Sequence, residues 1–218
     1  MRKKLLLALA VLLGVSRSAC PADLAVAPAS SLQNELNELA DRARPGTLGV
    51  TVSDLETGRT WRINADRSYP MMSVFKAPLG AAVLSESDQG ELSLDRTVVI
   101  GREDLMTTGV SEIARTFHGD RETFTVRQLL AAAVSHSDNT AADVLLRLAG
   151  GPGAVTAFLR AHGILHMRVD RNEAEIAQEF QQQGYAAYLK DPRDRTTAND
   201  AALFLRKLWQ GKLLSASS

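Results

Sequence analysis

The sequence predicts a mixed fold of the α+β or α/β class, in which helices pack beside an antiparallel sheet. Three observations predict it: an amphipathic helix comes first, a two-stranded hairpin follows, and most of the remaining chain shows helical periodicity. The 218 residues are 45% hydrophobic and 23% charged, which is an ordinary globular composition. This length is enough for one large domain or two small ones.

The N-terminal part of the fold is expected to be a helix followed by a hairpin. Residues 30–43 have leucines three and four positions apart on one face, a serine at the start, and Pro45-Gly46 after the end. Residues 49–52 and 60–63 have the composition of strands, and the turn residues between them predict an antiparallel hairpin. We therefore assign residues 23–66 to the N-terminal part of an α/β domain.

Residues 67–218 are predicted to form a helical domain. Apolar residues recur at helical spacing in several segments of this part of the chain. The expected helices are 73–85, 126–134, 140–148, 154–161 and 199–209. Residues 171–194 are polar and only weakly periodic, so we expect a long structured loop there, and loops of this length are usually functional or disordered.

The first residues have the pattern of a secretory signal. Basic residues 2–4 precede an apolar run, residues 5–15, which is too short to span a bilayer comfortably. Cleavage after Ala22 fits the small-residue rule, so we expect a signal peptide at residues 1–22 and a secreted, periplasmic protein. After removal of the signal we expect no membrane association. A lipid anchor on Cys20 is the alternative, although the arginine three positions before it fits that motif poorly.

Two classes of function are disfavoured by composition and spacing. The formal net charge is zero, so no basic surface indicates a nucleic-acid partner. His162 and His166 are four residues apart, but no Asp, Glu or Cys pattern accompanies them. We therefore predict no metal site.

Ser73 and Lys76 are the first candidates for chemistry. Positions i and i+3 of a helix share a face, so the serine hydroxyl and the lysine amine can meet. A serine needs an adjacent base to become a nucleophile, and a desolvated lysine can serve as that base. The spacing alone is also compatible with a capping serine and a solvated lysine.

The tripeptide Ser137-Asp138-Asn139 is the second candidate, and it lies between two apolar segments. Asp138 or Asn139 can simply cap the next helix. In the alternative reading, Ser137 shuttles a proton and Asn139 hydrogen-bonds a substrate amide.

Together, Ser73-x-x-Lys76 and Ser137-Asp138-Asn139 resemble the motifs of class A β-lactamases and penicillin-binding proteins. The resemblance spans nearly the whole chain after the signal. Further matching segments are 53–58, 126–130, 150–152 and 193–197. The resemblance implies a β-lactamase–transpeptidase-like fold, with an all-α domain beside an antiparallel sheet with helices.

Glu173 indicates the subgroup, because class A enzymes carry a glutamate in a large Ω-loop, here about residues 171–194. An acyl-enzyme ester persists until a base activates a water, and a carboxylate near the ester can be that base. Arg171 and Asp194 resemble the pair that closes the neck of this loop, where a bidentate contact would fit. Without the resemblance, Glu173 reads as a solvated acid and the pair as unrelated surface charges.

The mechanism that the resemblance implies is acylation followed by deacylation of a small-molecule β-lactam. Ser73 attacks the lactam carbonyl, and either Lys76 or Glu173 acting through a water takes its proton. Ser137 passes a proton to the leaving nitrogen. Asn139 orients the substrate, and Glu173 activates the hydrolytic water. The resemblance implies no cofactor and favours a monomer.

The sequence departs from the family pattern at two single positions and in one motif. Ala177 stands where most class A enzymes have an asparagine that holds the deacylating water, and Val110 stands where an aromatic residue often lines the entrance. The loop after Ala177 is longer than usual, as in the extended-spectrum subgroup. The third motif, Lys followed by Thr or Ser and then Gly, is missing, because the three lysines after Ser137 are followed by Asp or Leu.

We therefore expect the chain as given to be a fragment that lacks the C-terminal strands and helix, with poor solubility and no useful hydrolase activity. Losing one oxyanion donor alone costs about 10²–10³ in rate. Two other functions remain open. A D-alanyl-D-alanine peptidase, that is, a penicillin-binding protein, shares the first two motifs but normally lacks the loop glutamate. The other is a non-catalytic remnant that still binds β-lactams.

Overall fold

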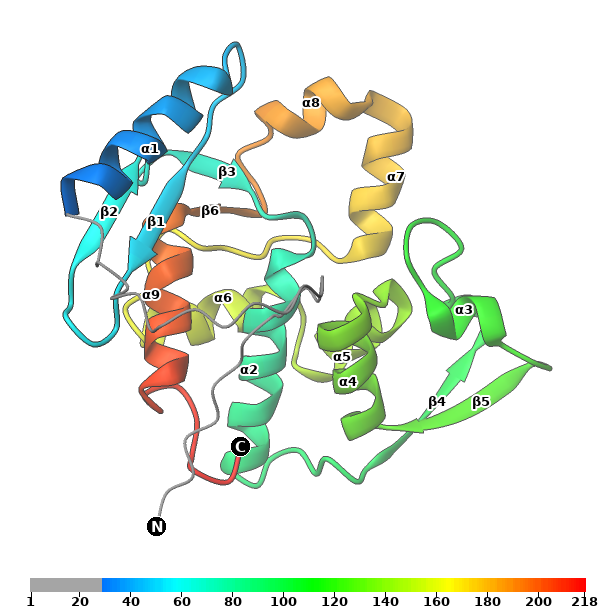
Figure 1. Ribbon diagram of the computed structural model, residues 1–218. Helices are drawn as coiled ribbons and strands as arrows, with labels where there is room; N and C mark the ends of the chain where they lie inside the picture. Colours follow the sequence, from blue (N-terminus) through cyan, green and yellow to red (C-terminus); the bar gives the residue numbers. More distant parts are fainter. Residues whose placement is uncertain (1–28) are drawn as a thin grey trace, which may run out of the picture.

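The computed structural model describes residues 29–218, and within them helices pack beside three small antiparallel sheets (Figure 1). The predicted mixed class with helices beside antiparallel strands is confirmed. The expected signal peptide at residues 1–22 lies outside the described residues.

The N-terminal helix and hairpin form as the sequence predicts. Helix α1 (Ala29–Arg42) is followed by β1 (Val50–Ser53) and β2 (Thr60–Ile63), which pair antiparallel. Helix α1 packs against β2, while α9 (Ala198–Trp209), from the far end of the chain, packs against β1 (Figure 1). The hairpin is therefore held between two helices distant in sequence, and the predicted domain boundary after residue 66 stays a prediction.

A second strand pair brings the residues after the expected Ω-loop next to the residues before Ser73. Strand β3 (Ser68–Pro70) pairs antiparallel with β6 (Arg195–Thr197). Next along the chain, the 3₁₀-helix η1 (Met72–Phe75) and α2 (Lys76–Asp88) follow β3 directly. The sequence analysis did not predict these strands, because three residues are too few to show a period of two.

The third strand pair and the remaining helices follow α2. Strands β4 (Thr97–Gly101) and β5 (Arg121–Thr125) pair antiparallel, and neither was predicted. The helical elements of this region are η2 (Arg102–Asp104), α3 (Glu112–Thr116), α4 (Val126–His136), α5 (Asn139–Leu148) and α6 (Pro152–Ala161). Three of them, α4, α5 and α6, lie where helices were expected.

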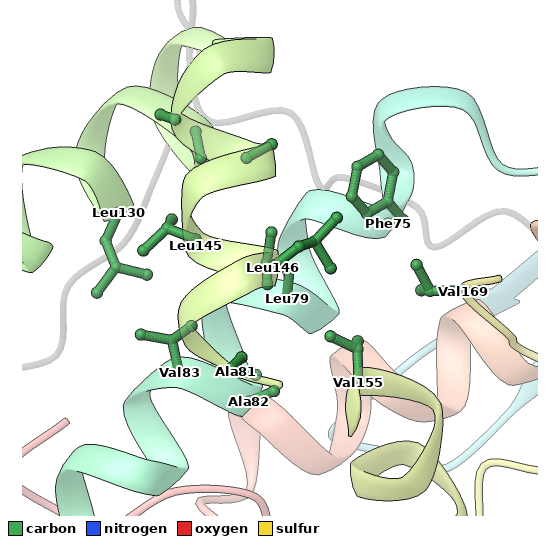
Figure 2. Close-up of a cluster of buried hydrophobic side chains, with 14 of the residues drawn as sticks. Phe75, Leu79, Ala81, Ala82, Val83, Leu130, Leu145, Leu146, Val155 and Val169 are labelled. Carbon is green, nitrogen blue, oxygen red and sulfur yellow. The ribbon is translucent and has the colours of Figure 1, made fainter. Parts of the chain in front are cut away.

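Helix α2 is the centre of the hydrophobic core, and α4, α5 and α6 all contact it (Figure 2). Leu79 of α2 is fully buried, as are Leu145 of α5 and Leu159 of α6. Since Lys76 is the first residue of the same helix, the packing that buries Leu79 also fixes the position of the candidate lysine.

The expected loop at residues 171–194 contains regular structure, so this part of the prediction was wrong. Helix α7 runs over Glu173–Gln183 and α8 over Tyr185–Lys190, separated by Gly184 in a positive-φ conformation. The signal was a capping box, in which Asn172 and Glu175 each accept the other's backbone N–H. Polar residues dominate α7, and this composition hides its periodicity.

The helix expected to begin at Ser73 begins differently. Met72 has φ 48, and the turn through Phe75 is 3₁₀ before α-helical geometry begins at Lys76. A non-glycine residue in the left-handed region is strained and persists only where its surroundings impose it. Here the Met71 N–H donates to the Asp194 carbonyl at 2.9 Å, which ties this turn to the end of the Ω-loop.

In the part of the chain that the structure describes, no single helix is long and apolar enough to cross a membrane. Helices α5 and α6 together meet the length and composition for it, with a bend of 71° between them.

Replacing Leu79 with alanine tests the role of α2 as the core helix. The Leu79→Ala variant should lose about 2–5 kcal/mol of unfolding free energy, because a cavity opens at a fully buried site. The matched control is Leu205→Ala on α9, where the leucine is 60% exposed and the expected change is within about 0.5 kcal/mol. Urea unfolding measures both, and equal losses would contradict this description of the core.

Candidate active site

Ser73 and Lys76 meet across the turn that leads into α2. Ser73 is exposed, whereas Lys76 is 2% exposed and is among the largest fully buried side chains. The Lys76 Nζ lies 3.3 Å from the Ser73 Oγ. Because the turn before Lys76 is 3₁₀, the i and i+3 side chains are nearly eclipsed, and the two groups face each other directly.

The Ser137-Asp138-Asn139 turn is held in place by its middle residue. Asp138 is fully buried and caps α5 by accepting the Ala141 N–H at 2.9 Å. The same carboxylate accepts the Ile113 N–H at 2.9 Å and the Ser111 hydroxyl at 3.0 Å. Asp138 therefore has a structural role, because its hydrogen bonds hold the adjacent residues Ser137 and Asn139 close to the start of α2.

Ser137 and Asn139 both contact the Lys76 ammonium. Ser137 is the left-handed C-cap of α4, with φ 57, and its carbonyl accepts from Nζ at 2.7 Å. Its hydroxyl lies 3.2 Å from Nζ, and the Asn139 Oδ1 lies 2.5 Å from it. The two motifs, far apart in the sequence, thus converge on one nitrogen.

Glu173 completes this cluster from the Ω-loop side. It is the first residue of α7, its side chain is 13% exposed, and its Oε1 lies 3.1 Å from the Lys76 Nζ. A helix N-terminus favours a negative charge at this position. The ion pair is largely out of water, where the attraction between the charges is stronger than at a surface.

The arrangement can move protons. An ammonium has three N–H donors, and Lys76 has five oxygen acceptors around it, so its hydrogens are shared among competing partners. Two of these acceptors are serine hydroxyls and one is a carboxylate. A proton leaving the exposed Ser73 hydroxyl therefore has a basic group within reach, as nucleophilic catalysis requires.

Arg171 and Asp194 meet at the neck of the Ω-loop. The Arg171 Nε donates to Asp194 Oδ2 at 2.6 Å, and both side chains are at least 95% buried. The other oxygen, Oδ1, accepts the N–H groups of Asp170 and Arg171 at 2.7 and 3.1 Å. The pair therefore closes the loop through both side-chain and backbone contacts.

A second arginine extends the neck into an ion-pair network. Arg193 donates to Glu179 of α7 and to Asp191, each at 2.6 Å, and Arg171 contacts the same two carboxylates. Hydrogen bonds from Arg193 hold the pKa of Asp191 well below its usual range. Sequence analysis missed this network, although the alternating charges of the segment were its signal.

Sequence analysis also missed Asp143, which lies on α5 close to Glu173. Its carboxylate accepts the Glu173 N–H at 2.7 Å, and burial raises the pKa of Asp143 to about 6. The signal was an acid within the mostly apolar segment 140–148.

Three residues with no assigned catalytic role lie around the site. Val110 is exposed, and its carbonyl accepts the Asn139 N–H at 2.8 Å, so its backbone supports the site whatever its side chain does. Ala177 lies half-buried on α7. His136 ends α4 beside a surface hollow that includes Val110. Within residues 29–218, no three His, Cys, Asp or Glu side chains gather as a metal site would require.

The comparisons with known proteins agree with this geometry. Residues 31–218 match the model of the β-lactamase enzyme family. Among solved structures, a β-lactamase from Chitinophaga pinensis is 32% identical, with a TM-score of 0.77 over 86% of this chain. An ancestral class A β-lactamase is 42% identical, with a TM-score of 0.74 over 85% of this chain. A class A β-lactamase of the last common ancestor of Gram-negative bacteria is also 42% identical, with a TM-score of 0.73 over 86% of this chain.

The chain therefore belongs to the β-lactamase enzyme family, and its structural relatives assign it to class A. The match covers 66% of the length of each of these three structures.

Replacing Arg171 tests how much the loop depends on its neck. Arg171→Ala leaves Asp194 buried without its cation, so we expect a loss of about 3–5 kcal/mol of unfolding free energy. Arg168→Ala is the matched control, because Arg168 pairs with Asp170 at a site where its own side chain is 49% exposed. Its loss should stay below about 1 kcal/mol. Chemical denaturation compares them, and a small effect at Arg171 would show that the loop closes without this pair.

Proposed function

We propose that this protein, in its complete form, hydrolyses β-lactam antibiotics through an acyl-enzyme on Ser73. The observation that carries the proposal is the position of the Lys76 Nζ, within 3.3 Å of both serine hydroxyls, the Asn139 amide oxygen and Glu173. β-Lactamase relatives with TM-scores of 0.73–0.77 support the same reaction. No metal or cofactor takes part in the proposed chemistry.

In the acylation step, the Ser73 Oγ attacks the lactam carbonyl carbon, and the ring C–N bond breaks. The serine proton passes to Lys76 if this side chain is the neutral amine, or to Glu173 through a water if Lys76 is the ammonium. In the second route Glu173 afterwards passes that proton to Lys76, which has given its own proton to Ser137. The ring nitrogen receives a proton from Ser137, whose hydroxyl regains one from Lys76 at 3.2 Å. Asn139 orients the substrate amide.

In the deacylation step, Glu173 takes a proton from a water as that water attacks the ester carbonyl. The ester bond to Ser73 then breaks, the serine oxygen recovers a proton, and the opened β-lactam leaves as an acid. Glu173 suits this role because the start of α7 holds it beside Lys76 and next to the nucleophile's helix. The position of this base favours hydrolysis over a peptidase reaction that ends in transfer.

The place of action is proposed to be the periplasm, and the active form a monomer. Basic residues 2–4 and the apolar run at 5–15 support export.

Acylation should depend on Ser73. Intact-mass spectrometry with a slowly hydrolysed β-lactam should show one adduct, located on a peptide that contains Ser73. Ser73→Ala should abolish the adduct, whereas Ser135→Ala, which removes an exposed hydroxyl on nearby α4, should retain it. An adduct of equal yield in Ser73→Ala would refute the assignment of the nucleophile.

Deacylation should depend on Glu173 more than acylation does. In Glu173→Ala the ester forms but no base activates the water, so acyl-enzyme should accumulate and turnover should fall by about 10²–10⁴. Glu175→Gln removes a charge from the same helical turn but keeps an acceptor for the Asn172 N–H, and it should deacylate at the parental rate. Stopped-flow single-turnover kinetics separates the two steps. Parental turnover by Glu173→Ala would point to another base.

A further inference from the structure

A hollow of about 440 Å³ lies between the end of the β1–β2 hairpin and the second half of α9, the helix that packs against β1 (Figure 1). Its volume is in the range of pockets that hold small molecules. None of the residues of the candidate active site lines it. The hollow is therefore separate from the groups that the proposed reaction uses.

Two regular elements build the walls of this hollow. Ser53 and Thr60 are directly opposite each other in the hairpin, so their side chains share one face of the sheet. This face is turned toward α9, because the hydroxyl of Thr51, two residues before Ser53, donates to the first turn of that helix at 2.8 Å. The helix lines the hollow with side chains that recur at helical spacing on one face: Leu203, Arg206, Lys207 and Gln210.

The hollow has a positive charge that nothing inside the protein neutralises. Arg206 and Lys207 line it from α9, and Lys212 lines it from the segment after the helix. Within residues 29–218, none of these three side chains makes an ion pair or a hydrogen bond, whereas Arg171 and Arg193 are held by carboxylates. The donors of the three cations are therefore available to an anion.

The single acid among the described lining residues is already used by the hairpin turn. The Asp54 carboxylate accepts the Thr57 hydroxyl, and it accepts the N–H groups of Glu56 and Thr57 at 2.9 and 3.1 Å. The bond from the Thr57 side chain, followed by the two from the backbone, lowers the pKa of Asp54. Its oxygens are thus directed into the turn, and one carboxylate leaves an excess of positive charge in the hollow.

Part of this charge has a structural explanation, because cations in the last turn of a helix offset its dipole. Arg206 and Lys207 lie in that last turn, but Lys212 lies beyond the helix. The dipole also does not account for the hydroxyls of Ser53 and Thr60 on the opposite wall, which can donate to anionic oxygens. Charged and neutral donors that converge on one hollow are the arrangement that phosphate groups require.

We propose that this hollow binds a phosphate-bearing anion, either a soluble phosphate compound or the headgroup of an anionic lipid. Arg206 presents a planar fork of donors to two phosphate oxygens, and Lys207 and Lys212 add point charges. The hydroxyls of the hairpin complete the site from the other side. The proposal does not depend on the proposed function, since the two sites share no residue.

Calorimetric titration of the full chain with inorganic pyrophosphate tests the proposal. We expect saturable one-to-one binding that weakens as the salt concentration rises. Lys207→Gln should weaken it by about 10- to 100-fold, because a hydrogen bond between two charged groups is lost. Lys190→Gln, which removes an exposed lysine from α8, is the matched control and should bind like the parent.

Thr60→Val separates a built site from a diffuse basic surface, because it removes a donor without changing any charge. Binding to a built site should weaken by about 10-fold, since the lost hydrogen bond is one to a charged group. Parental affinity in Thr60→Val, equal weakening by Lys207→Gln and Lys190→Gln, or the absence of saturable binding to the parent would each overturn the proposal.

Vesicles distinguish the two sources of the phosphate group. Sedimentation of the parent with vesicles that contain phosphatidylglycerol, but not with phosphatidylcholine alone, assigns a lipid headgroup if the double variant Lys207→Gln and Lys212→Gln no longer sediments. Binding of pyrophosphate without binding of vesicles supports the site and assigns it to a soluble phosphate compound. Vesicle binding that the double variant retains, together with no pyrophosphate binding, would refute the site.

Discussion

The burial of the Lys76 ammonium is the constraint on which the rest of the site depends. Moving such a charge out of water costs several kcal/mol, and the cost is offset only if its donors are satisfied and a counter-charge is near. Five oxygens surround this nitrogen: one from η1, two from Ser137 at the end of α4, one from α5 and one from α7. Each of these elements must therefore be in place before the lysine can be, which couples the assembly of the site to the assembly of the core.

Glu173, one member of that cluster, lies in the Ω-loop, so the ion pair with Lys76 also depends on how the two ends of the loop are held together. Arg171 and Asp194 are both buried at the neck, and Arg193 joins α7 to the loop's end through Glu179 and Asp191. In this network Glu179 and Asp191 each contact two arginines. Fixing one side chain therefore serves several ion pairs, and the conformational entropy lost per ion pair is lower than for isolated pairs. The end of the loop then reaches the turn that carries Ser73, because the Asp194 carbonyl accepts the Met71 N–H.

Much of the fold and of the candidate site could be predicted from the sequence, and there are physical reasons why some elements were missed. Ser73 and Lys76 became candidates because helical spacing places them on one face, and Asn139 because it lies in a polar turn between apolar segments. The resemblance of the two motifs, taken together, to a known family then favoured the catalytic interpretation of all three. Helix α7 was missed because it buries little apolar surface and its stability comes from a cap and ion pairs, which leave no hydrophobic period. Strands β4 and β5 escaped because their pairing is a contact between segments, and neither segment alternates strongly. In the sequence, Asp143 was visible only as an acid in a mostly apolar helix. Its hydrogen-bond partners lie in the segment that was predicted to be a loop.

The charges around Lys76 do not balance, because two carboxylates lie near one ammonium. One ammonium faces the carboxylate of Glu173, and Asp143 adds a second carboxylate behind the same helix turn. Their mutual repulsion is one reason that the pKa of Asp143 is raised, after burial. The partly buried Asp143 thus holds the backbone of Glu173 through two hydrogen bonds, although burial and the neighbouring carboxylate both oppose its own charge.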